Sequence, residues 1–213
     1  MNSSSLRNSN LDALIGESSL SQKQKRSWHI SFNSPVVLSI AAISVIATVL
    51  GYLTNGVSTK LLFCTYNCSP LDPLGYVRLF THIFGHSGWE HLVSNMAYIL
   101  LLGPILEEKY GSKTLIEIVA ITALACALVN NIFFPRQALL GASGVVFAFI
   151  LLSSVTSIRE GEIPLTFILV ALIFLGQQVY EGIFVADNIS QLTHIIGGVI
   201  GAIAGFVLAK PKA

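Results

Sequence analysis

Residues 191–209 read QLTHIIGGVIGAIAGFVLA and hold no Asp, Glu, Lys or Arg. A helix needs roughly 20 consecutive apolar residues to cross a bilayer, and this stretch is about that long. Gly197, Gly201 and Gly205 recur at every fourth position, so they lie on one helix face and let a neighbouring membrane helix approach closely. His194 lies near the start of the same stretch. The stretch therefore predicts a tightly packed membrane helix that carries one titratable group.

Further apolar runs precede this stretch. They cover about residues 35–55, 89–108, 112–134, 142–158 and 163–183. The chain is 53% hydrophobic and only 11% charged, which leaves too few polar side chains for the surface of a soluble domain. The runs lack the alternating pattern of barrel strands, and helices satisfy their own backbone groups inside lipid. We therefore expect an all-α integral membrane protein, a bundle of six transmembrane helices.

The N-terminal residues differ in character from the rest of the chain. Residues 1–33 are rich in Ser, Asn, Lys and Arg and contain no apolar run, so they predict a disordered cytoplasmic tail rather than a cleaved signal peptide. Residues 34–213 form the predicted six-helix membrane domain. Six crossings put both termini on one side, which would carry nine Lys and Arg residues against three on the other. Because basic residues accumulate in cytoplasmic segments, we expect both termini in the cytoplasm and the protein in the cell membrane.

Polar residues lie near the starts of the three even-numbered helices. His91 and Asn95 begin the second, Ser143 the fourth and His194 the sixth. With a cytoplasmic N-terminus, each of these helices runs inward from the outer face, so the four residues should share one depth in the outer half of the bilayer. Polar groups are costly inside lipid and by default mark a functional site.

Ser143 and His194 are the pair of side chains that acyl transfer needs. A serine becomes a strong nucleophile when a neighbouring base accepts its proton, and histidine is the usual base. The backbone N–H of Ser143, the Asn95 amide and the His91 ring are candidate donors to a developing oxyanion. His91 and Asn95 lie four residues apart and so share a helix face. The pattern favours a serine hydrolase without a metal or cofactor.

Small residues in the fourth helix match the glycines of the sixth. Gly144 and Ala148 offer a surface against which the glycine face could pack. Such packing would bring His194 within about 3 Å of Ser143, which is hydrogen-bond reach. A serine among small residues is, taken singly, most often a packing residue. The functional interpretation therefore depends on the joint pattern.

Three motifs resemble the rhomboid family of intramembrane serine proteases in their order and spacing. They are His91-Leu-Val-Ser-Asn95, Gly141-Ala-Ser143-Gly144, and His194-Ile-Ile-Gly197 continuing to Gly201. The resemblance covers about residues 76–205. It includes Glu107 between Gly103 and Gly111, where family members carry a structural glutamate.

The resemblance implies a role for each motif residue. Ser143 would be the nucleophile and His194 the general base and acid, with no catalytic Asp. His91, Asn95 and the Ser143 backbone would form the oxyanion hole. Supporting positions would be Gly141, Gly144, Phe147, Gly197, Gly201 and His86. Substrates would be transmembrane proteins cut near the outer membrane boundary, admitted past the fifth helix and its cap near Asp187.

The chain departs from the family pattern at two positions. Val77 precedes Arg78 where family members often carry Trp, and Phe147 stands where they often carry Tyr. Phe147 can stack on His194 but has no hydroxyl to donate. Neither change removes a group that the proton transfer needs.

A metalloprotease is the nearest alternative, because His82, His86 and His91 lie close to Glu90. The chain has no H-E-x-x-H motif, and the spacing from His86 to His91 is one residue too long for the inverted form. We therefore expect no metal, and expect His86 to shape the oxyanion side of the cavity instead.

Other functions fit less well. A transporter would be expected to show a repeat between its halves, which the sequence lacks. Glu117, a charged residue in the third helix, is the residue that best supports a transporter. An inactive relative that binds membrane proteins would be expected to lack Ser143 or His194, and this chain has both. Nucleic-acid binding is not expected, because the net charge of +1 gives no basic patch. Oligomeric state stays open, as does a disulfide between Cys64 and Cys68 on an oxidising side.

Overall fold

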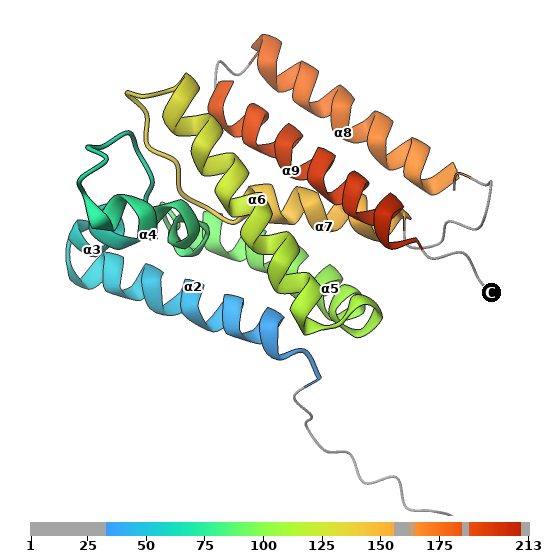
Figure 1. Cartoon of the computed structure of the whole chain (residues 1–213), viewed down its shortest axis with the longest axis horizontal. Coiled ribbons are helices and arrows are strands. Elements are labelled where there is room, and N and C mark those ends of the chain that lie inside the picture. Colours follow the sequence, from blue (N-terminus) through green and yellow to red (C-terminus); the bar gives the residue numbers. More distant parts are fainter. Residues whose placement is uncertain (1–32, 156–162, 164, 185–187, 210–213) are drawn as a thin grey trace, which may run out of the picture. The chain divides into compact units, whose positions relative to one another are not determined.

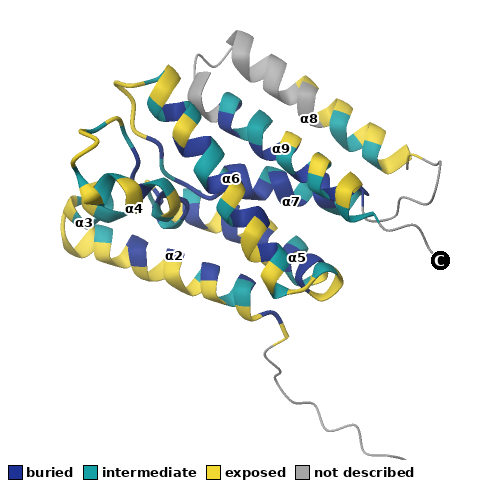
Figure 2. Ribbon diagram, in the orientation of Figure 1, coloured by how far each residue is buried: buried dark blue, intermediate teal, exposed yellow. Residues whose placement is uncertain are grey.

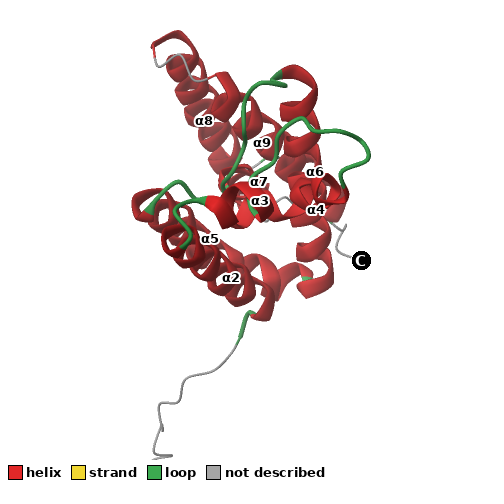
Figure 3. Ribbon diagram, turned by 90° about the vertical axis from the view of Figure 1, so that its left-hand side faces the viewer, coloured by secondary structure: helices red, strands yellow, loops and turns green. Residues whose placement is uncertain are grey.

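The computed structural model describes residues 33–155, 163, 165–184 and 188–209 (Figure 1), although not the side chains at 174, 175, 177–184 and 188–190. Each predicted apolar run forms one helix. These are α2 (Pro35–Leu53), α5 (Trp89–Tyr110), α6 (Ser112–Phe133), α7 (Ser143–Val155), α8 (Leu165–Phe184) and α9 (Asn188–Leu208). The predicted tail lies outside the described residues except at Asn33. The described chain consists of helices and loops, as Figure 3 shows, so the all-α prediction is confirmed.

Three described segments are long and apolar enough to cross a membrane. They are Pro35–Leu53, Ser112–Phe133 and Gln191–Leu208. The helix α7 is apolar but has only 13 residues, and α5 carries Glu107, Glu108 and Lys109 in its last turns. The chain is therefore a helical membrane protein, while the count of six crossings stays a prediction.

The core lies around α7, which packs against α5, α6 and α9. Val145, Phe149 and Leu152 of α7 are at most 1% exposed. Figure 2 shows the buried residues concentrated on α7 and on the inward faces of its neighbours. Large apolar side chains such as Leu53 and Val207 are instead 75% and 76% exposed. An exposed apolar exterior of this kind suits a lipid environment.

Glu107 joins the start of α2 to the turn between α5 and α6. Its carboxylate accepts hydrogen bonds from the backbone N–H groups of Val36 at 3.0 Å and Val37 at 3.1 Å, and from the Ser112 hydroxyl at 2.7 Å. The first N–H groups of a helix lack partners within the helix, and a negative charge there is favourable. The structural role that the resemblance implied for Glu107 is therefore confirmed.

The loop between α2 and α5 contains three short helical segments. They are α3 (Val57–Leu62), α4 (Pro73–Thr81) and the 3-10 helix η1 (His82–Phe84). Residue Asp72 caps α4 by accepting a hydrogen bond from Leu74 N–H at 3.0 Å. Its other oxygen accepts a hydrogen bond from Arg78 at 2.6 Å, which holds the pKa of Asp72 below its usual range. These contacts fold the loop onto itself.

The sequence of residues 77–89, VRLFTHIFGHSGW, alternates apolar with polar residues, which is compatible both with a place in the membrane interface and with an external cap. Arg78 is only 2% exposed, and its guanidinium lies 4.5 Å from the centre of the Tyr66 ring. Val77 and Phe80 on the same helix are instead 46% and 43% exposed. A helix that buries its charge and exposes its apolar side chains favours the interfacial location.

Candidate active site

The predicted site residues lie near the starts of three helices. His91 and Asn95 belong to the first two turns of α5, and Ser143 is the first residue of α7. His194 lies in the second turn of α9. Asn95 is buried, and the other three are half-buried.

The helices α7 and α9 touch backbone to backbone. A Cβ atom added to Gly197 would lie 2.0 Å from the Gly144 carbonyl oxygen, and one added to Gly201 would lie 2.0 Å from the Ala148 carbonyl oxygen. Real Cβ atoms do not approach oxygen so closely, so only glycine permits this contact. The predicted packing of the two small-residue faces is therefore confirmed, and it holds α9 against the turn of α7 that begins with Ser143.

Gly141 brings the start of α7 against α5. Its φ angle of 120° is one that other residues rarely adopt. A Cβ atom here would lie 2.8 Å from two atoms of the His91 ring and 3.8 Å from Asn95 Nδ2. Because Gly141 has no side chain, His91 and Asn95 of α5 can lie close to the segment that leads to Ser143.

The segment before Ser143 is held by backbone hydrogen bonds to the loop between α2 and α5. Thr65 and Leu139 exchange two N–H to carbonyl bonds of 2.9 and 2.8 Å. Gly141 N–H donates to the His82 carbonyl at 3.0 Å. The loop therefore positions the start of α7, a role that the sequence analysis missed because a single antiparallel pair leaves no periodic pattern.

Ser87 determines which nitrogen of His91 carries the proton. Its backbone N–H lies 3.4 Å from His91 Nδ1, and its hydroxyl lies 3.1 Å from the same atom. An N–H can only donate, so Nδ1 acts as the acceptor and neutral His91 carries its proton on Nε2. Since Nε2 lies on the Gly141 side of the ring, an N–H donor faces the segment leading to Ser143.

The Asn95 side-chain amide is a second hydrogen-bond donor near the start of α5. Its side chain is 6% exposed, and Nδ2 has no hydrogen-bond partner among the described residues. Most buried polar atoms are paired, and an unpaired one often belongs to a catalytic group. An amide in this state can donate to an oxygen that arrives with a substrate.

His86 lies beside His91, with the two ring centres 5.0 Å apart and the rings edge to face. Its Nδ1 donates to the Phe84 carbonyl at 3.1 Å. Burial, with a smaller contribution from the neighbouring His91, lowers the pKa of His86 to about 4, so the ring is neutral at physiological pH. In the described parts of the chain, no three His, Cys, Asp or Glu side chains are grouped so that they could hold a metal ion.

Phe147 packs on the ring of His194. The two ring centres lie 4.3 Å apart at an interplanar angle of 40°, so the predicted contact between the rings is present in a tilted rather than a stacked arrangement. The preceding residue, Thr193, accepts a hydrogen bond through its carbonyl from the Cys126 thiol at 3.6 Å. This part of α9 is thereby held by α6 and α7 together, while the predicted bond from His194 to Ser143 stays a prediction.

A small cavity of about 10 Å³ reaches Ser143, close to the space that one water molecule requires. Thr122, His82 and Thr193 are among the residues that line it, beside apolar residues such as Leu139 and Val145. The cavity is thus at the lower limit of the size that can hold one water molecule.

Two other predictions concern the surroundings of the site. The gate predicted at the cap near Asp187 lies outside the described residues. Cys64 and Cys68 are free thiols in the structure and form no disulfide.

Comparison with known proteins identifies relatives of the chain. The Rhomboid domain model matches residues 73–211, more than half of the chain. Rhomboid-like protein 11, chloroplastic, of Arabidopsis thaliana is 24% identical over 149 residues, covering 63% of this chain and 53% of that protein. Rhomboid-related protein 2 of Mus musculus is 29% identical over 144 residues, covering 62% and 47%.

A bacterial relative is named as a protease. Rhomboid protease GlpG of Salmonella choleraesuis (strain SC-B67) is 33% identical over 109 residues, covering 50% of this chain and 39% of that protein. The chain spans about half the length, or less, of these curated relatives. The extent of the domain match and the helical membrane architecture lead to one conclusion: this multi-pass membrane protein belongs to the rhomboid family.

Proposed function

We propose that the protein is an intramembrane serine endopeptidase that cleaves transmembrane proteins near the outer membrane boundary. The observation that carries the proposal is the backbone contact between α7 and α9, because it brings the helical turn of Ser143 close to the helical turn of His194. The name of the Salmonella relative, Rhomboid protease GlpG, supports the same activity.

The reaction begins at Ser143. His194 accepts the hydroxyl proton while Oγ bonds to the carbonyl carbon of the scissile peptide, and the electron pair of the C=O double bond moves to the oxygen. Collapse of this intermediate breaks the C–N bond, and His194 delivers its proton to the leaving amine. Water then attacks the ester, again with His194 as the base, and releases the acid and free Ser143. The small cavity beside Ser143, which is about the size of one water molecule, supports a place for that water.

The oxyanion receives its hydrogen bonds from three donors. They are the backbone N–H of Ser143, Nε2–H of His91 and Nδ2 of Asn95. Support for this assignment comes from the hydrogen bonds of Ser87 to His91 Nδ1, which leave the other ring nitrogen as the donor, and from the unpaired Asn95 amide. Donors held in place in this way stabilise charge that develops only in the transition state.

Phe147 orients the base without donating to it. Its ring lies against the His194 ring and restricts the positions that the imidazole can adopt. A hydroxyl at this position would add a hydrogen bond but would transfer no proton in the steps above.

Substrate selection follows from the location of the site. A peptide bond inside a helix is shielded, so a membrane substrate must unwind locally before Ser143 can attack, and Gly or Pro near the cleavage point would assist. With both termini cytoplasmic in the cell membrane, the site lies in the outer half of the bilayer. Cleavage would then release the outer part of the substrate.

The test uses the purified full chain in liposomes with a model single-span substrate and a fluorophosphonate probe. Wild type should cleave the substrate and take up one probe, while Ser143→Ala and His194→Ala should do neither. Ser154→Ala is a matched control on the same helix, because its hydroxyl donates only to the Ile150 carbonyl. Cleavage that persists in both site variants would overturn the proposal, and cleavage abolished by EDTA would favour the metalloprotease instead.

A further inference from the structure

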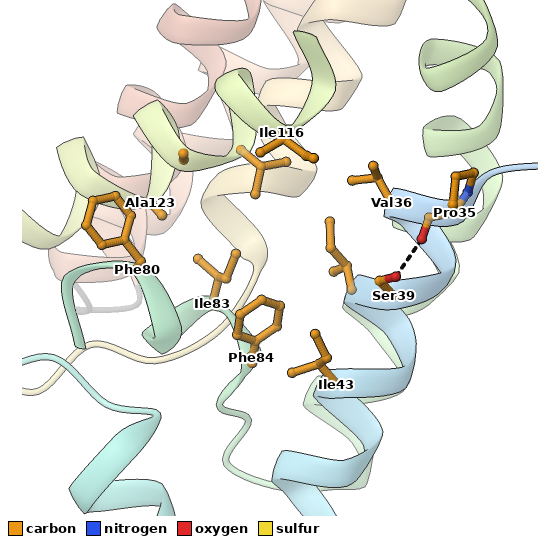
Figure 4. A pocket seen from close by; sticks show the side chains of 12 residues that line it. Pro35, Val36, Ser39, Ile43, Phe80, Ile83, Phe84, Ile116 and Ala123 are labelled. Atoms are coloured by element: carbon orange, nitrogen blue, oxygen red, sulfur yellow. Dashed lines mark hydrogen bonds between the residues drawn. The ribbon is translucent and has the colours of Figure 1, made fainter. Parts of the chain in front are cut away.

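A second cavity lies between α2, α6 and η1 (Figure 4). Its volume is about 390 Å³, within the range of sites that bind small molecules. Two of its lining residues, Ile83 and Ala123, also line the small cavity at Ser143, so the two spaces lie back to back. The larger cavity has no role in the proposed reaction.

The lining of this cavity is suited to an aliphatic occupant. Ser39 is the only polar residue among the 12 that line it, and its hydroxyl donates to the Pro35 carbonyl of its own helix at 2.7 Å. A bound water needs two to four polar partners, and the lining offers no unpaired side-chain group. A polar ligand would find no unpaired side-chain partner in this lining, whereas a hydrocarbon chain needs none.

Aromatic rings of Phe80 and Phe84 line one end of the cavity. Along α2 its lining runs from Pro35 to Ile43, a rise of about 12 Å at 1.5 Å per residue. Figure 4 shows Phe84 of η1 beside Ile43, and Phe80 beside Ala123 of α6. A transmembrane helix of a substrate or a second copy needs roughly 30 Å and would meet this aromatic end, whereas one acyl chain can stop below it.

The other end lies where α2 and α6 both begin. Glu107 ties these two starts together, since it accepts hydrogen bonds from Val36 and from Ser112. Lys113, one turn before the lining residue Ile116, is 92% exposed at this end. Its ion pair with Glu117 is 3.9 Å long and exposed to solvent, which makes the pair weak.

We propose that this cavity binds one acyl chain of an anionic phospholipid from the leaflet at which α2 and α6 begin, with the headgroup phosphate next to Lys113. The apolar lining suits the chain, its short length of about 12 Å along α2 suits a chain better than a helix, and the lysine suits an anionic headgroup. Such a lipid is an integral part of the structure at the back of the active-site wall.

The test uses the full chain in liposomes that contain phosphatidylglycerol with a photoreactive diazirine in its acyl chain. After irradiation, peptide mass spectrometry should find the label concentrated on residues 35–43 and 116–123. Ala120→Phe and Ser39→Phe fill the cavity from its two walls and should each lower this labelling about fivefold or more, because each lost methylene contact weakens lipid binding. Ile121→Phe is the matched control, since Ile121 is 57% exposed on α6 and does not line the cavity.

The headgroup is tested separately by competition with unlabelled lipids. Phosphatidylglycerol should compete better than phosphatidylcholine in wild type, and Lys113→Gln should remove that preference. Lys60→Gln, which removes an exposed charge at the other end of α2, should leave it unchanged.

Two results would overturn the proposal. One is wild-type labelling that is no denser in the cavity than around Ile121, and the other is labelling unaffected by either filling variant. The distribution of the label on the wild-type chain tests lipid binding in the cavity even where a variant fails to fold. Labelling does not depend on proteolysis, so failure of the proposed enzyme activity would be recognised separately.

Discussion

The contacts that α9 makes with α7 and that α2 makes with α6 are opposite in kind. Between α7 and α9, glycines remove the side chains, and carbonyl oxygens lie where a Cβ atom would otherwise be. Between α2 and α6, apolar side chains line a cavity of about 390 Å³. In the proposed reaction Ser143 and His194 exchange a proton, which needs a fixed separation that backbone contact would provide. The proposed lipid instead needs a gap between helices.

The largest expected effect comes from breaking the close contact. Gly201→Ala forces a methyl group onto the Ala148 carbonyl, and overpacking typically costs about 1–3 kcal/mol. We expect a lower thermal midpoint and loss of cleavage. Gly176→Ala in α8 is the matched control, because its added Cβ atom meets no atom within 4 Å. Equal midpoints for the two variants would show that the contact is not tight.

The next effect concerns the site that this contact supports. Asn95→Ala should lower kcat by about 10²–10³-fold, the usual cost of losing one oxyanion donor. Stability should change little, because Nδ2 has no partner in the described structure. Kinetics with a membrane substrate, alongside thermal unfolding, separate the two quantities. A variant that unfolds early but retains its kcat would make Asn95 a structural residue instead.

A smaller effect is expected on the α2 side. Glu107→Gln replaces a carboxylate that accepts from Val36, Val37 and Ser112 by a group that accepts at only one atom. Loss of a buried hydrogen bond costs about 1–3 kcal/mol, so the thermal midpoint should fall while KM changes little. Glu108→Gln, on the exposed neighbour, is the control. If the thermal midpoint fell by the same amount in both variants, Glu107 would not be stabilising the start of α2 as a cap.

The smallest effect is pH dependent. Arg78 lowers the pKa of Asp72, so folded Asp72 binds its proton less readily than the unfolded chain does. The stabilisation is present above the unfolded pKa of about 3.9 and is lost as the pH falls through the lower folded pKa. Acidification from about pH 6 to about pH 3 should therefore lower the midpoint of wild type more than that of Asp72→Asn. Identical pH profiles would show that the pair does not stabilise the loop.

Much of this architecture was predictable from sequence. The helix boundaries follow from apolar runs, and the contact between α7 and α9 follows from glycines at every fourth position, since both signals are local and periodic. The contact of Phe147 with His194 was expected instead from the family resemblance. The order of three short motifs was sufficient to indicate the family.

The loop between α2 and α5 was not predictable in the same detail. The pair of backbone hydrogen bonds between Thr65 and Leu139 joins residues far apart in the chain, and the sequence around neither residue predicts it. The inward position of Arg78 depends on Asp72 and Tyr66, which surround it only after the loop has folded. The lipid-sized cavity is a space between elements and therefore has no sequence signature of its own.

The glycine contact also restricts motion. If α9 slid along α7 or rotated against it, the oxygens of Gly144 and Ala148 would no longer face the glycines and would meet the larger side chains beside them. We therefore expect the two helices to move as one rigid piece. If the proposed protease opens to admit a substrate, the opening would take place elsewhere in the bundle, so locking α7 to α9 with an engineered disulfide should leave turnover intact.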